Sequence, residues 1–168
     1  MFHPFTNKRL PAEERITNLL SLMTVEEKVG ALGRADLTRL GVRWAPSVEG
    51  LHGLAQDGVA NWLPRKRVRT TIFPQSYGLG STWDPDILRS VGHIEGYECR
   101  YIWQNEDLKQ GAILAFAPNA DLGRDPRWGR TEECFGEDPW LVGTLSAAMV
   151  RGLQGDDKNY WQCASLMK

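Results

Sequence analysis

The stretch "NADLGRDPRWGRTEECFGEDP", residues 119–139, combines three arginines and six carboxylates with three glycines and two prolines. A solvated charged surface does not need so many turn residues, and a buried core does not tolerate unpaired charges. A guanidinium group can donate two parallel hydrogen bonds, either to a carboxylate or to vicinal hydroxyls of a sugar. The segment therefore has two candidate roles: a ligand-binding loop, or an ion-pair network that holds the loop in shape.

The ion-pair role would join Arg127 and Arg130 to Asp125, Glu132 or Glu133. Ion-pair networks are often architectural, and chemistry alone favours that role for about two of the three arginines. A phosphate cradle is disfavoured, because the segment is net acidic and has no Gly-Lys-Ser/Thr ending. One arginine is thus expected to remain available for a ligand.

A second group of candidate residues lies in "VEGLHG", where Glu49 and His52 stand three residues apart. Glu49 could accept hydrogen bonds from sugar hydroxyls or act as a general acid or base, or it could cap a helix or form a salt bridge. His52 has the alternative of a structural histidine, and a metal site is disfavoured because no second ligand stands at the required spacing. Lys168, the last residue, is either solvated or directed into a site at the end of a strand.

Aromatic and basic residues give weaker signals. Trp128 lies between Arg127 and Arg130, which suits a platform for a sugar ring, although core packing is the expected role for most of the seven tryptophans. A basic loop could bind a polyanion, but solvation is the better interpretation because aromatic residues do not interleave it. Its basic residues are Arg65, Lys66, Arg67 and Arg69.

The chain alternates between helical and strand patterns. A helical region is expected over residues 11–32, and further helices are expected from Asp84-Pro85 and from Asp138-Pro139 onward. Residues 41–50 are expected to form a short strand followed by a turn, so that "SVEGLHG" lies after this strand. Buried strands are expected within 112–118 and 161–167, and a weak strand at 71–75. Thr24 and Glu27 form a capping-box pattern within the first helical region. The apolar stripe of the second helix is expected at Ile87, Val91, Ile94, Tyr101 and Ile102, and that of the third at Leu141, Leu145, Met149 and Leu153.

This order of elements predicts a parallel α/β fold, whose sites form after the carboxyl ends of the strands. The segments "SVEGLHG" and "PNADLGRDPRWGR" both fall at that edge. A complete eightfold barrel takes about 250 residues, and this chain ends at or just after a strand. We therefore expect an incomplete barrel, with residues 1–168 forming part of one domain.

Bulk properties exclude several classes of function. The net charge of −1 does not call for nucleic acid or an anionic membrane as a partner. No signal peptide and no membrane-spanning stretch is recognisable. Three widely spaced cysteines, Cys99, Cys134 and Cys163, disfavour a disulfide framework, and a cytoplasmic location is expected. No metal or cofactor is expected.

Several long motifs resemble glycoside hydrolase family 3. The segment "PNADLGRDPRWGRTEECFGEDPWLVG" is similar to the signature that follows the third barrel strand of that family, and "TIFPQSYGLGSTWDPDILRSVGHIEGYE" is similar to its preceding segment. "VEGLHG" and "ASLMK" are similar to its first-strand loop and to the lysine of its Lys-His pair. The motifs follow in the order of the family from about Glu14 onward.

The resemblance implies a retaining exo-β-glycosidase with a TIM-like barrel, acting on terminal β-linked glucose or xylose. It implies that Glu49, Arg124 and Lys168 bind sugar hydroxyls in the −1 subsite, and that a second set of residues braces the arginine loop. The bracing residues would be Asp125, Arg127, Arg130 and Glu133. Glu at position 49, where the family has Asp or Glu, leaves less room for a hydroxymethyl group and leans toward xylose.

Retaining hydrolysis needs two carboxyl groups about 5–5.5 Å apart, and in the family both come from later sequence. The chain is thus expected to be inactive alone and to need a complementary chain, or to form a homo-oligomer. Two alternatives stay open. One is a non-catalytic carbohydrate-binding remnant; the other is an independent enzyme that uses Glu49 with Glu132 or Glu133.

Overall fold

The computed structural model describes residues 3–33, 36–42, 46–55, 68–105 and 112–168. The chain packs into two compact units, Met1–Trp44 and Ala45–Lys168, each of which is described by itself. Of the basic loop, Arg65, Lys66 and Arg67 lie outside the described residues. No helix within the described ranges is long and apolar enough to cross a membrane.

The predicted helical region over residues 11–32 consists of two helices in the first unit, and the second begins at the predicted capping box. Helix α1 spans Ala12–Leu22 and α2 spans Val25–Gly30, flanked by the 3₁₀ turns η1 (Pro4–Thr6) and η2 (Thr38–Leu40). The break follows from the capping box, which is confirmed: Thr24 accepts from the Glu27 amide, and Glu27 accepts from the Thr24 amide at 2.8 Å. An N-cap residue has non-helical backbone angles, so a new helix must start there.

The second unit is built on three parallel strands in the order β1-β2-β3. They are β1 (Ser47–Glu49), β2 (Leu114–Phe116) and β3 (Ala164–Ser165), with Val48 opposite Ala115 and Ala115 opposite Ser165. The predicted strands within 112–118 and 161–167 are confirmed as β2 and β3, although both are shorter than their apolar runs. The first strand was misplaced: the sequence predicted it before the segment "SVEGLHG", whereas β1 begins at Ser47 and includes Glu49. The weak strand at 71–75 was wrong: the Phe73 amide donates to the His52 carbonyl, and helix α3 (Ser76–Gly80) follows.

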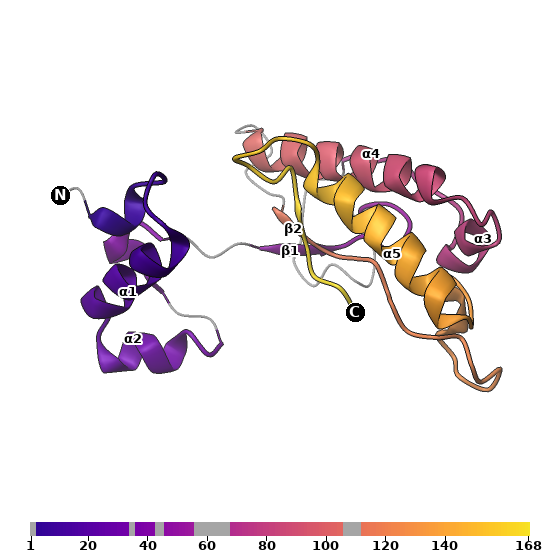
Figure 1. Cartoon of the computed structure of the whole chain (residues 1–168), viewed down its shortest axis with the longest axis horizontal. Helices are drawn as coiled ribbons and strands as arrows, with labels where there is room; N and C mark the ends of the chain where they lie inside the picture. Colours follow the sequence, from indigo (N-terminus) through magenta and orange to yellow (C-terminus); the bar gives the residue numbers. More distant parts are fainter. Residues whose placement is uncertain (1–2, 34–35, 43–45, 56–67, 106–111) are drawn as a thin grey trace. The chain divides into compact units, whose positions relative to one another are not determined.

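Helices α4 (Pro85–Gln104) and α5 (Pro139–Gln154) connect the strands and lie side by side (Figure 1). Both predicted caps are confirmed: Asp84 accepts from the amides of Asp86 and Ile87, and Asp138 accepts from that of Leu141. Because the strand order follows the chain and such crossovers are right-handed, both helices cover the same face of the sheet.

The buried face of α4 differs from the predicted stripe. Ile87, Ile94 and Tyr101 are exposed, whereas the side chains in the core are those of Leu88, Val91, Glu95, Cys99 and Ile102. The true face has the spacing of a helix, but it includes a glutamate and a cysteine, which a search for large apolar residues passes over. On α5 the predicted stripe is confirmed from Leu145 through Met149 to Leu153, with Leu141 half-buried.

The tryptophans that the structure describes lie outside the core, whereas core packing was expected for most of the seven. None of the five tryptophans in the described ranges belongs to the buried core. Trp83, Trp140 and Trp161 are strongly exposed. The buried core is made mainly of aliphatic residues, alanines and cysteines, together with Phe135.

Glycines allow α4 and α5 to approach closely. A Cβ added to Gly92 would lie 2.3 Å from the Met149 carbonyl oxygen, and one added to Gly152 would lie 2.1 Å from that of Arg89. Such contacts are too short for any carbon atom. The interface between the helices therefore depends on backbone contact at these positions.

A carboxyl group is buried where the core meets the first strand. Glu95 has no exposed surface, and neither of its carboxyl oxygens has a hydrogen-bond partner in the structure. A Cβ on Gly50, the residue after β1, would lie 3.4 Å from Glu95 Oε2. Burial raises the pKa of Glu95 to about 8.

The first prediction concerns the glycine contact. Gly152→Ala is expected to lower the free energy of unfolding by about 2–4 kcal/mol, because the new methyl group must push the helices apart. Gly143→Ala, on the same helix, is the matched control, since a Cβ there has no neighbour within 4 Å. It is expected to stabilise by up to about 1 kcal/mol through helix propensity. Urea unfolding of both variants checks this, and equal stabilities would contradict the packing.

The second prediction concerns Glu95. The unfolded chain ionises this group from pH 4.5 upward while the folded chain keeps it protonated to about pH 8. Its contribution to folding is therefore complete below pH 4.5 and falls by up to roughly 1.4 kcal/mol per pH unit above it. Glu95→Gln is expected to remove this fall, whereas the exposed control Glu137→Gln keeps it. Urea unfolding at pH 5, 6, 7 and 8 measures the slope, and an unchanged slope in Glu95→Gln would rule the account out.

Candidate functional site

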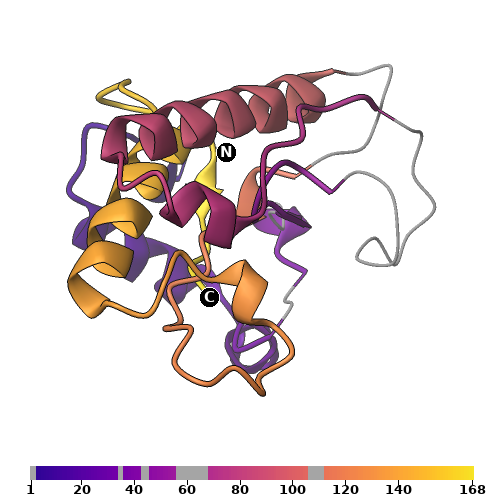
Figure 2. The ribbon, with the colours of Figure 1, turned by 90° about the vertical axis from the view of Figure 1, so that its right-hand side faces the viewer.

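The carboxyl ends of the three parallel strands meet at one edge of the sheet, as such strands must. Glu49 is the last residue of β1, Asn119 follows β2, and Lys168 follows β3. The end of the chain lies against the segment after β2 (Figure 2), where the Ala120 amide donates to the Lys168 carbonyl at 2.8 Å and the Lys168 amide donates to that of Pro118 at 3.0 Å. Backbone hydrogen bonds thus fix Lys168 at this edge.

Glu49 and Lys168 form an ion pair across this edge. The Lys168 Nζ lies 3.1 Å from Glu49 Oε2, and the two side chains are 25% and 33% exposed respectively. A carboxylate is an acceptor and an ammonium group is a donor, so the pair presents both hydrogen-bonding functions to the same space. Partial exposure leaves both groups accessible to a ligand.

A second ion pair lies beside the first. The Arg130 guanidinium donates to both carboxylate oxygens of Glu133, at 2.7 and 2.5 Å, and the Asn119 side-chain amide donates to Glu133 at 3.3 Å. The hydrogen bonds from Arg130, more than any other cause, lower the pKa of Glu133, and the charge of Lys168 adds to this. Glu133 is therefore an ionised acceptor of hydrogen bonds from Arg130 and Asn119.

The other residues of the charged segment divide between pairing and exposure. Arg127 donates to both carboxylate oxygens of Asp125, at 2.9 and 2.7 Å, which lowers the pKa of that carboxyl group. Arg124 is exposed, and its guanidinium makes no ion pair with any residue that the structure describes. Trp128 is half-buried, and its carbonyl accepts from the Thr131 hydroxyl. The internal pairing considered from the sequence is thus present for two of the three arginines.

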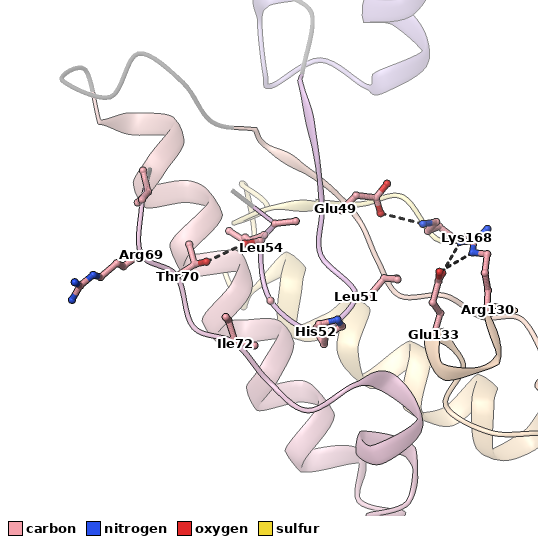
Figure 3. Close-up of a pocket in the computed structure, with 13 residues that line it drawn as sticks. Glu49, Leu51, His52, Leu54, Arg69, Thr70, Ile72, Arg130, Glu133 and Lys168 are labelled. Carbon is pink, nitrogen blue, oxygen red and sulfur yellow. Dashed lines mark hydrogen bonds and ion pairs between the residues drawn. The ribbon is translucent and has the colours of Figure 1, made fainter. Parts of the chain in front are cut away.

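A pocket of about 1030 Å³ opens at the strand edge (Figure 3). Its walls carry both ion pairs, together with residues of the loop after β1 and of segment 68–72; they are Glu49, Leu51, His52, Gly53, Leu54, Ala55, Val68, Arg69, Thr70, Ile72, Arg130, Glu133 and Lys168. The Thr70 hydroxyl donates to the Leu54 carbonyl, which ties the two segments together. The side chain of Arg69 is directed away from the Glu49–Lys168 pair.

The pocket brings together most, but not all, of the residues expected from the sequence. Glu49, Lys168, Arg130 and Glu133 line it, whereas Arg124 does not. His52 lines it as well, with its Nδ1 buried and without a hydrogen-bond partner in the structure. Within the described ranges, no group of three or more His, Cys, Asp or Glu side chains is arranged to hold a metal ion.

Sequence reasoning missed Asn119 and the wall formed by residues 68–72. Asn119 is buried, accepts from the Asp121 amide and donates to Glu133, so it joins β2 to the charged loop. Its position directly after a buried apolar run was a usable signal. The wall of residues 68–72 had no such signal, because its place depends on tertiary hydrogen bonds to the loop after β1.

Comparisons with known proteins agree with the fold. A family model described as "Glycosyl hydrolase family 3 N terminal domain" matches residues 30–167. A solved family 3 exo-β-xylosidase, in complex with a xylobiose aziridine activity-based probe, superimposes with a TM-score of 0.75 at 26% identity, over 98% of this chain and 21% of that one. The predicted fold class is confirmed: this is a mixed α/β structure with a parallel sheet that aligns with part of a family 3 barrel enzyme.

Two curated relatives show the range of similar enzymes. The chain is 34% identical to a xylan 1,4-β-xylosidase of Xylanibacter ruminicola, over 96% of this chain and 19% of the relative. It is 30% identical to the periplasmic β-glucosidase of Salmonella typhimurium, over 90% of this chain and 22% of the relative. The chain thus spans about a fifth of the length of the curated relatives it matches. With the family model covering most of the sequence, the chain belongs to glycoside hydrolase family 3, within whose N-terminal domain it lies.

Proposed function

We propose that this chain forms one side of the −1 sugar subsite of a retaining exo-β-glycosidase that releases terminal β-linked xylose. The observation that carries the proposal is the Glu49–Lys168 pair at 3.1 Å, placed in the pocket by two different strands. A sugar hydroxyl both donates and accepts, so it can bind between a carboxylate and an ammonium group with two charge-assisted hydrogen bonds. This arrangement also explains why both side chains remain partly exposed.

The neighbouring pair supports the subsite without binding the sugar directly. Glu133 is occupied by Arg130 and Asn119, and Asp125 is occupied by Arg127. Pairing of this kind keeps the loop after β2 in one conformation, and a preorganised site loses less entropy when it binds. Arg124 is exposed and forms no ion pair within the described ranges. It is proposed as the third sugar-binding residue, reaching the ligand after a change of side-chain rotamer.

The chain alone is not expected to catalyse hydrolysis. Retaining glycosidases need one ionised carboxylate and one protonated carboxyl group near the scissile bond. Glu133 cannot serve as the proton donor near neutral pH, because Arg130 lowers its pKa. The nucleophile and the acid/base are proposed to come from sequence outside these 168 residues, in a complementary chain or in the rest of a longer protein.

Xylose is preferred over glucose for two reasons. A glutamate at position 49 extends further into the subsite than an aspartate and leaves less room for a hydroxymethyl group. Several curated relatives are described as β-xylosidases, among them those of Xylanibacter ruminicola and Arabidopsis thaliana. The similarity to a periplasmic β-glucosidase makes glucose the competing sugar.

The third prediction tests the ion pair by binding. Lys168→Met is expected to weaken binding of methyl β-xyloside about tenfold or more, because a charged hydrogen bond contributes about 1.5–3 kcal/mol. Lys158→Met, on an exposed residue beyond α5, is the matched control and is expected to bind like the wild type. NMR titration gives the affinities, and circular dichroism checks that both variants are folded. Wild-type affinity in folded Lys168→Met would refute the assignment.

The fourth prediction tests sugar preference at position 49. Wild-type protein is expected to bind methyl β-xyloside more tightly than methyl β-glucoside, and Glu49→Asp is expected to narrow the difference by making room for the hydroxymethyl group. The size of the change is on the order of that of one methylene in a pocket, about 1–3 kcal/mol. The same NMR titration with both glycosides measures it. Tighter binding of the glucoside by the wild type would favour a β-glucosidase.

A further inference from the structure

The two cysteines Cys99 and Cys163 meet in the core of the second unit, although 64 positions separate them in the sequence. Cys99 lies on the buried face of α4, and Cys163 directly precedes β3. Their sulfur atoms are 3.2 Å apart, and the two residues are 1% and 0% exposed. The third cysteine, Cys134, follows the 3₁₀ helix η3 (Thr131–Glu133), and its sulfur contacts neither of the other two in the described structure.

We propose that Cys99 and Cys163 are a redox pair whose reduced form is seen here and whose oxidised form is a disulfide between α4 and β3. A disulfide bond is about 2.05 Å long. Closing the present gap thus requires each sulfur to move by only about half an ångström or slightly more, which side-chain rotation can supply.

The pKa values of the two thiols shift in opposite directions, which determines which thiol reacts first. Hydrogen bonding with Cys99 lowers the pKa of Cys163, and the backbone amide of Ala115 adds to this effect. The pKa of Cys99 is raised by its hydrogen bond with Cys163 and by burial. Cys163 is therefore the thiol that ionises first, and the thiolate is the nucleophilic form.

The oxidant is a small-molecule disulfide such as glutathione disulfide. The Cys163 thiolate attacks one sulfur of the oxidant, which forms a mixed disulfide and releases one glutathione thiolate. The Cys99 thiol then gives its proton to that thiolate and attacks the Cys163 sulfur, which expels the second glutathione thiolate. Through solvent, this second thiolate takes up the proton that Cys163 released when it ionised. Two protein thiols are oxidised to one disulfide, and one glutathione disulfide is reduced to two glutathione molecules. Because both sulfurs are buried, local opening must precede the first attack.

The cross-link would connect structure that supports the sugar site. Helix α4 also carries Glu95 beneath Gly50, and β3 leads directly to Lys168. Closing a loop of this length restricts the unfolded chain, and the expected rise in melting temperature is on the order of 10 °C.

The test uses the wild-type chain and both redox states. One sample is incubated in glutathione disulfide at pH 8 and another in dithiothreitol; a third is refolded from the reduced, unfolded state in the glutathione buffer, so that burial cannot block exchange. All are then denatured, alkylated and analysed by intact mass and peptide mapping. We expect one alkylated cysteine, Cys134, and a Cys99–Cys163 cross-linked peptide after oxidation, and three alkylated cysteines after reduction.

Variants assign the effect to the pair. Cys134→Ser is the matched control and should keep both the cross-link and the rise in melting temperature, whereas Cys99→Ser and Cys163→Ser should lose both. Three alkylated cysteines after refolding in the glutathione buffer would overturn the proposal. So would glutathione adducts without a cross-link, or a cross-link that includes Cys134. The experiments on wild-type protein test the Cys99–Cys163 disulfide even if a serine variant does not fold.

Discussion

The parallel pairing of β1, β2 and β3 is the constraint on which the site depends. It places the carboxyl ends of three strands side by side and thereby joins Glu49 to Lys168 across 119 positions of sequence. The contact between Glu49 and Lys168 therefore depends on strand pairing and not on residues adjacent to either of them in the sequence. Helices α4 and α5 pack against each other through glycines and cover one face of the sheet. We therefore expect that a loss of helix contact at Gly92 or Gly152 would shift the strands and, with them, Glu49 and Lys168.

Charge compensation is the second feature of the site. Each of these carboxylates in the pocket is paired with a cation: Glu49 with Lys168, and Glu133 with Arg130. The Arg130 pair is bidentate and keeps its carboxylate fully engaged, whereas the Glu49 pair is a single contact with exposed surface on both sides. The first arrangement suits a brace and the second suits a site that exchanges its internal contact for a ligand. This difference in geometry separates the proposed binding residues from the bracing residues.

Sequence patterns predicted the features of the structure that depend on residues close together in the chain. The capping box at Thr24, the Asp-Pro helix starts and the buried strand around Ala115 all follow from residues near each other in sequence. The buried face of α4 was predicted only in part: Val91 and Ile102 are buried as expected, whereas Glu95 and Cys99 were missed because they are not large apolar residues. The contact between Cys99 and Cys163 was missed because it exists only once β3 docks against α4. That contact also weakens the reason for expecting a cytoplasmic location, which stays a prediction.

The central claim is that this chain holds half of a sugar site and needs further sequence for hydrolysis. The most direct measurement combines the intact mass of every polypeptide in a purified sample with hydrolysis of 4-nitrophenyl β-xyloside by that sample. The account predicts no turnover by a single species of 18.9 kDa, and turnover only where a second polypeptide or a longer chain is present. Turnover by the 18.9 kDa species alone would contradict it, because the nucleophile and the proton donor would then have to lie within these 168 residues.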